Sequence, residues 1–152
     1  MKTTIRTIVL ASLVAIAALS QTAVAQTGVP STKVDIPFAF DSGTQQFAAG
    51  EYSLSMHSQN LLRLRHGNRT SLILIQTGYD PTKIKAGYVE FRKYGDRHFF
   101  AGYAPANGSI RVSVLESKAE RRVARDFAAN HLTPSTLQLA LLSDGSGNAQ
   151  SR

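Results

Sequence analysis

Short segments in which apolar and polar residues alternate recur along this chain, and residues typical of turns separate them. A period of two places one row of side chains in a core and the other in solvent, as in a half-buried β-strand. We expect about seven strands, in the segments 34–40, 51–56, 62–65, 72–75, 84–94, 97–103 and 110–114. Their shortness and number predict a mainly β fold, either an antiparallel barrel or a two-layer sandwich.

Four local features give more specific expectations. Pro37 cannot donate a backbone hydrogen bond, so the strand that contains it should lie at a sheet edge. Residues 72–75 are apolar on both faces, which predicts a central strand covered on both sides. Gly95 and Asp96 separate two alternating segments and suit a type II′ hairpin turn. The segment 77–82 carries Gly and Pro and should be a loop.

At Ser117 the pattern changes to one typical of a helix. Ser117 and Glu120 match the Ser-x-x-Glu capping box, and good helix formers follow. We therefore expect one C-terminal helix over about 118–130. Residues 137–142 should then add a short strand or a packing segment, and the polar residues 143–152 should form a disordered tail.

The expected helix has two different faces. An apolar face should pack on the sheet, and it carries Ala119, Val123 and Phe127. The opposite face carries four cations, which are Lys118, Arg121, Arg122 and Arg125. This basic face is a candidate polyanion-binding site, although basic residues on a helix are also typical of an ordinary solvated surface.

The first 25 residues have the pattern of a cleaved signal peptide. Lys2 and Arg6 give a cationic start, 8–19 form a mostly apolar run, and small residues end the segment at Ala25. We expect cleavage before Gln26 and export of the protein, to a periplasm or to the outside of the cell. The apolar run is too short for a permanent spanning helix, so we expect no transmembrane segment in the mature chain.

The remaining sequence indicates one domain. We expect a flexible lead-in over 26–32, which carries Gly and Pro, and a single β-rich domain over 33–142. The chain has no cysteine, which excludes disulfides and thiolate sites.

The charge of the chain favours acidic partners. It has 17 basic and 10 acidic residues, and without Lys2 and Arg6 the net charge is still about +5. An exported basic protein meets acidic envelope components more often than nucleic acid, and no nucleic-acid motif is present, so we do not expect DNA or RNA as a partner.

The sequence carries no recognisable catalytic, cofactor or metal motif. The four histidines, His57, His66, His98 and His131, lack the spacings that place two ligands on one strand or helix face. No nucleophile elbow, phosphate-binding loop or dinucleotide-binding turn occurs. Glu51, Glu90 and Asp96 are not spaced to form a carboxylate pair. We therefore expect no enzyme activity, no cofactor and no metal.

Four segments carry a resemblance to other proteins, and they are 34–40, 49–52, 92–97 and 117–121. Between about Val34 and Arg125 the chain resembles a group of small exported bacterial proteins of unassigned function. That group is expected to have Pro at the position of Ala48, and the segment after Asn130 has no counterpart in it. The resemblance implies export and a β-rich domain, and it implies no activity, cofactor or site residue.

Two functional hypotheses follow. In the first, the domain is a binding module whose interior holds a small apolar or amphiphilic ligand, between the inward side chains Ile36, Phe38, Leu54, Leu64 and Val112. In the second, it is an interaction or structural protein of the cell envelope that binds polyanions through the basic helix face. The tip of the expected hairpin is a further candidate surface, and it comprises Tyr94, Gly95, Asp96 and Arg97.

Overall fold

The computed structural model describes residues 31–82 and 84–142. The expected signal peptide, its cleavage site between Ala25 and Gln26, and the expected tail 143–152 lie outside the described residues. The expected lead-in extends one residue too far, because Thr32 already belongs to the first strand.

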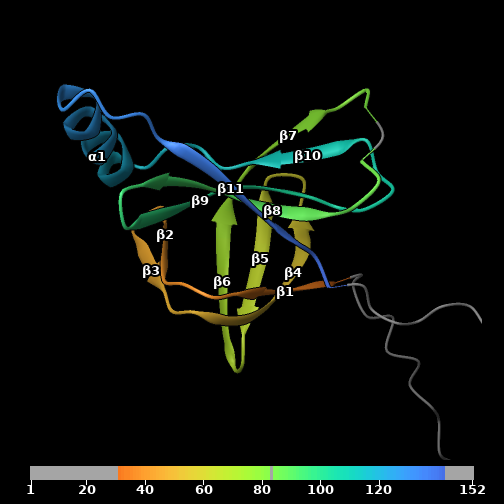
Figure 1. The fold of residues 1–152 in the computed structure, drawn as a ribbon. Coiled ribbons are helices and arrows are strands. Elements are labelled where there is room, and N and C mark those ends of the chain that lie inside the picture. Colours follow the sequence, from red (N-terminus) through yellow and green to blue (C-terminus); the bar gives the residue numbers. More distant parts are fainter. Residues whose placement is uncertain (1–30, 83, 143–152) are drawn as a thin grey trace, which may run out of the picture.

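The fold is mainly β, with two sheets and one C-terminal helix in the described part of the chain (Figure 1). The first sheet is antiparallel and has the order β1-β4-β5-β6. Its strands are β1 (Thr32–Ile36), β4 (Gly50–Ser58), β5 (Leu61–His66) and β6 (Arg69–Leu74). As Pro37 predicts, β1 is an edge strand, and it ends just before this proline.

The second sheet has the order β11-β8-β9-β10-β7, and the hairpin of β2 and β3 is attached to β9. Its strands are β2 (Phe40–Ser42), β3 (Gln45–Phe47), β7 (Gln76–Tyr79), β8 (Tyr88–Tyr94), β9 (Arg97–Ala104), β10 (Ile110–Ser113) and β11 (Ser135–Ala140). The helix α1 (Lys118–Ala129) lies between β10 and β11 in sequence. The two sheets of the described residues do not close into a barrel, so the fold is sandwich-like.

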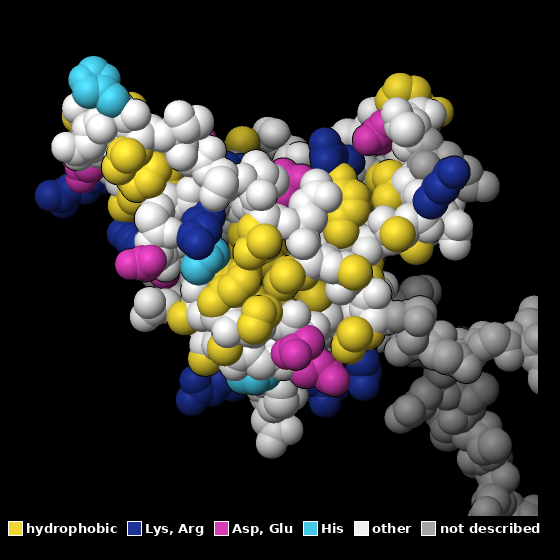
Figure 2. All heavy atoms as spheres, viewed as in Figure 1, with side chains coloured by type: hydrophobic (Ala, Val, Ile, Leu, Met, Phe, Trp, Pro, Cys, Tyr) yellow, Lys and Arg dark blue, Asp and Glu magenta, His cyan; other side chains and the backbone are white. Residues whose placement is uncertain are grey.

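The two sheets enclose one apolar core. Fully buried side chains come from both sheets, and the largest are Tyr52, Phe40, Phe91, Phe99 and Phe100. The ring of Phe91 makes edge-on contacts with the rings of Phe38, Phe40 and Phe100. Hydrophobic side chains also gather on the face between β1 and β11 (Figure 2). At one end of that face the two strands meet, where the Leu142 N–H donates to the Lys33 carbonyl oxygen at 2.8 Å.

The expectation of a central strand at 72–75 is wrong. The strand β6 lies at the edge of the four-stranded sheet, with Ile73 and Ile75 buried but Leu72 and Leu74 48% and 61% exposed. The apolar residues on both faces of β6 therefore do not mean that both faces are buried. One row packs in the core and the other is left open to solvent.

The described part of the chain contains eleven strands rather than about seven. The expected loop 77–82 contains most of β7, and β2 and β3 were missed because they are only three residues long. All four side chains of β7 are exposed, so this strand shows no apolar alternation. The segment expected as a strand or packing segment at 137–142 contributes to β11, which pairs with β8.

The expected hairpin is confirmed as β8 and β9. Tyr94 pairs with Arg97, and Gly95 and Asp96 form the turn between them. Gly95 has φ of 60° while Asp96 is outside the left-handed region, as the type II′ turn requires.

Both helix caps are built from local side-chain and backbone chemistry. The Ser117 hydroxyl accepts a hydrogen bond from the Glu120 N–H at 3.0 Å, as the capping box predicts. At the other end His131 and Leu132 donate to the carbonyl oxygens of Ala128 and Phe127, which is the Schellman arrangement.

His131 occupies the left-handed position of this cap, with φ of 56°. Glycine has no steric penalty in that conformation, so we expect His131→Gly to raise the free energy of unfolding by about 1 kcal/mol. Urea unfolding followed by circular dichroism measures this change. An unchanged or lower stability would contradict the assignment of His131 to the cap.

Candidate functional site

The structure brings the four predicted cations together on one side of α1. Residues 118, 121, 122 and 125 fall within about 100° of arc on a helix, and all four side chains are exposed. We call this surface the basic helix face, with members Lys118, Arg121, Arg122 and Arg125. Within the described residues, none of the four forms an ion pair.

The opposite side of the helix packs only partly. Val123, Ala124 and Phe127 are half-buried, and the Phe127 ring meets the Tyr94 ring edge-on at 5.8 Å between centroids. The expectation that Ala119 belongs to this packed face is wrong, since its side chain is exposed. Glu120 takes that place, because residues 120, 123, 124 and 127 share one face of a helix.

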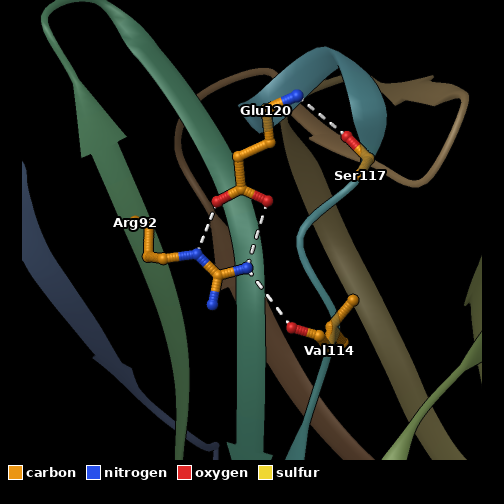
Figure 3. A network of polar contacts seen from close by, with 4 residues as sticks. All are labelled: Arg92, Val114, Ser117 and Glu120. Carbon is orange, nitrogen blue, oxygen red and sulfur yellow. Dashed lines mark hydrogen bonds and ion pairs between the residues drawn. The ribbon is translucent and has the colours of Figure 1, made fainter. Parts of the chain in front are cut away.

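A buried ion pair holds the start of α1 against the sheet (Figure 3). The Arg92 Nε and Nη2 atoms donate to the two carboxylate oxygens of Glu120 at 2.5 and 3.1 Å. Nη2 also contacts the Val114 carbonyl oxygen at 3.3 Å. The Glu120 side chain is 3% exposed and that of Arg92 is 24% exposed. The pair is therefore bidentate and largely shielded from water.

Glu120 also favours the charged form of Arg92. Partial burial acts to lower the pKa of Arg92, but the hydrogen bond to Glu120 and its charge raise the pKa above its ordinary value. The guanidinium therefore stays cationic. Glu120 lies on the side of the helix opposite the basic helix face, and its carboxylate is engaged by Arg92. It therefore does not pair with the basic helix face.

The sequence identified the basic helix face but missed Arg92 and Glu120 as partners. Glu120 was assigned only to the cap, and its N–H does form that cap. A signal was present, because a carboxylate on the apolar side of a helix needs a cation opposite it. The sequence does not show that β8 supplies this cation from 28 residues away.

The hairpin tip forms a less continuous surface than expected. Gly95, Asp96 and Arg97 are exposed, but the expected tip residue Tyr94 is buried. The Arg97 Nη2 atom is 2.6 Å from an Asp41 carboxylate oxygen, and its guanidinium lies over the Phe99 ring. Arg97 is thus already paired within the fold, and Tyr94 packs with the helix.

The side chains expected to line a ligand cavity pack into the core instead. Ile36, Leu54, Leu64 and Val112 belong to the buried cluster, and Phe38 packs against it. The Phe38 ring also stacks on His98 at 4.0 Å between centroids. Burial, together with the charge of Lys93, lowers the pKa of His98.

The other histidines lie apart. His57 contacts Arg63, His66 stacks on Tyr52, and His131 follows the helix. Among the residues that the structure describes, no three His, Asp or Glu side chains are arranged to hold a metal ion.

Within residues 31–82 and 84–142, no helix has the length and apolar character needed to cross a membrane. The chain matches no protein-family model, no curated protein and no solved structure.

Proposed function

We propose that this chain is an exported, non-catalytic binding module of the cell envelope, and that the basic helix face binds a polyanionic envelope component. The observation that carries the proposal is the grouping of Lys118, Arg121, Arg122 and Arg125 on one exposed side of α1. Four cations without an ion-pair partner in the described structure favour a multivalent anion over a single carboxylate.

The position of the helix supports this function. α1 stands at a corner of the molecule, beside the ends of β8 and β9 (Figure 1). Its opposite side is fixed by Glu120 and Phe127, so the four cations keep one orientation toward solvent. A rigid display of charge costs less entropy on binding than flexible side chains on a loop.

The small-ligand hypothesis has less structural support. The five inward side chains that would surround an interior ligand pack in or against the core. Binding of an apolar ligand in the interior stays a prediction, which a hydrophobic-dye titration of the mature protein tests.

Replacing the three arginines together tests the proposed function. Arg121→Gln with Arg122→Gln and Arg125→Gln keeps good helix formers at solvent-exposed positions, so folding should be nearly unchanged. Retention on heparin and on vesicles of anionic lipid should fall sharply at low salt. A plot of log affinity against log salt concentration has a negative slope, and the magnitude of this slope should fall by about 2 to 3, because fewer counterions are released.

Phe127→Ala provides the control for folding. It leaves the four cations in place but removes a half-buried ring, so it should cost about 2 kcal/mol of stability while retaining polyanion binding at low temperature. Equal retention of the wild type and the triple variant on heparin and anionic vesicles would refute the proposal.

A further inference from the structure

Among the residues that the structure describes, the strand β6 has a free backbone edge. β5 is its neighbour within the four-stranded sheet, and Ile75 donates its N–H to the Asn60 carbonyl oxygen at 2.9 Å. The pair of Asn60 and Ile75 continues the register of β5 and β6. Hydrogen-bonded pairs alternate along an antiparallel ladder, so the backbone N–H and C=O groups of the odd-numbered residues of β6 point toward β5. The N–H and C=O groups of Thr70, Leu72 and Leu74 therefore point away from the sheet.

A second free edge lies opposite. Within residues 31–82 and 84–142, the strand β3 pairs only with β2. Figure 1 shows this hairpin on the side of the molecule where β6 ends its sheet. Two open clefts, of about 640 and 280 Å³, lie between the β2–β3 hairpin and β6, and both are lined by Gln45. We call these two clefts together the β3–β6 slot.

The slot contains an unsatisfied polar atom. Ser42 is 7% exposed, and its Oγ atom is buried with no hydrogen-bond partner in the described structure. Ser42 also lines the smaller cleft. Buried hydroxyl groups are normally hydrogen-bonded, so Ser42 is an exception among the described residues, and it lies beside the slot.

The two ends of the slot differ in chemistry. The smaller cleft is apolar, with Leu72, Leu74 and Leu115 along it. The larger one is also mainly apolar, but the cation Arg69 lines it. No Asp or Glu lines either cleft in the described structure. A ligand with an apolar end and an acidic end matches this arrangement.

We propose that the β3–β6 slot binds an extended segment of a partner protein by strand addition to β6. The added strand would pair with the outward N–H and C=O groups of Leu72 and Leu74, and its acidic end would lie beside Arg69. The six residues of β6 span roughly 20 Å, which matches a segment of similar length. This inference is independent of the basic helix face.

Charge favours a different protein over a second copy of this chain. The β6 strand, Arg-Thr-Ser-Leu-Ile-Leu, contains no Asp or Glu, so β6 of a second copy would offer no carboxylate to Arg69 or to Arg63 and Arg65 on the neighbouring β5. An acidic segment instead gains from the same cations. The occupant is therefore an acidic, partly apolar peptide segment.

Two synthetic peptides test the proposal, with the sequences Glu-Glu-Thr-Val-Thr-Val and Lys-Lys-Thr-Val-Thr-Val, each carrying a fluorophore. The protein is the mature chain with Arg121→Gln, Arg122→Gln and Arg125→Gln, so that the basic helix face contributes no binding. Fluorescence anisotropy should show binding of the Glu peptide at least about tenfold tighter than that of the Lys peptide. Amide exchange at Leu72 and Leu74 should slow when the Glu peptide binds.

Variants of the free edge locate the site. Leu72→Lys with Leu74→Lys should weaken binding of the Glu peptide at least about tenfold, because charged side chains oppose strand addition. The matched control is Ile110→Lys with Leu132→Lys, which adds the same charges at positions 53% and 52% exposed and should bind as before. Circular dichroism confirms that each variant folds.

Three outcomes would overturn the proposal: no binding of either peptide, equal binding by the edge and control variants, or unchanged exchange at Leu72 and Leu74. A dimer in analytical ultracentrifugation that Leu72→Lys with Leu74→Lys converts to a monomer would show that a second copy occupies the slot. That result would also overturn the assignment to a partner protein. All of these peptide-binding experiments use a protein that lacks the three arginines. A negative result would therefore not bear on the proposed polyanion binding by the wild type.

Discussion

Phe91→Ala is expected to lower the free energy of unfolding by about 4 kcal/mol. The Phe91 side chain is fully buried, and its ring meets those of Phe38, Phe40 and Phe100 at 5.2, 5.3 and 5.7 Å between centroids. The substitution removes a large ring from the core cluster, to which side chains of both sheets contribute, and leaves a cavity there. Urea unfolding measured by circular dichroism and intrinsic tyrosine fluorescence gives the change.

Leu74→Ala is the appropriate control for this prediction. It also truncates a large apolar side chain on a strand, but that side chain is mostly exposed, so the cost should stay below about 1 kcal/mol. A similar cost for the two variants would show that Phe91 is not at the centre of the core.

The second large effect is expected at the ion pair of α1. Glu120→Gln removes the negative charge opposite Arg92 and leaves a guanidinium that is mostly withdrawn from water. Breaking a buried pair in this way should cost about 3 kcal/mol of stability. The loss should be measurable by urea unfolding, and early proteolysis within α1 should accompany it, because the helix loses its main polar attachment to β8.

A double variant distinguishes the contribution of the ion pair from the cost of leaving one buried charge without its partner. Arg92→Met combined with Glu120→Leu removes both charges and replaces them with apolar side chains, so much of the stability lost in Glu120→Gln should return. If instead the double variant loses as much as the sum of its single changes, the two residues do not act as a pair.

The sequence predicted the features that depend on local chemistry. The Gly95–Asp96 turn, the Ser117 cap and the start of α1 each follow from a few adjacent residues. Features decided by tertiary contacts were not predicted. The apolar sequence of β6 is compatible both with a central strand and with an edge strand that has one face open to solvent. The strand β7 is held by backbone pairing with β10, so its side chains carry no pattern.

The candidate sites follow the same division. The basic helix face is visible in the sequence, because residues three and four apart lie together on a helix. The β3–β6 slot is not visible, since β3 and β6 are 21 residues or more apart and become opposed only when the two sheets pack. Nothing in the neighbours of Ser42 indicates that its hydroxyl is buried without a partner in the described structure.

The contact between Lys33 and Leu142 has a consequence for the order in which the domain can fold. It joins the first strand of the described chain to the residues just after the last one, and β11 must also cross back past α1 to reach β8. Contacts between such distant segments form late, because they require the closure of long loops. Synthesis from the N-terminus therefore leaves one edge of β8 unpaired until the segment through Ala140 has emerged. The nascent chain exposes that edge to other strands throughout this time.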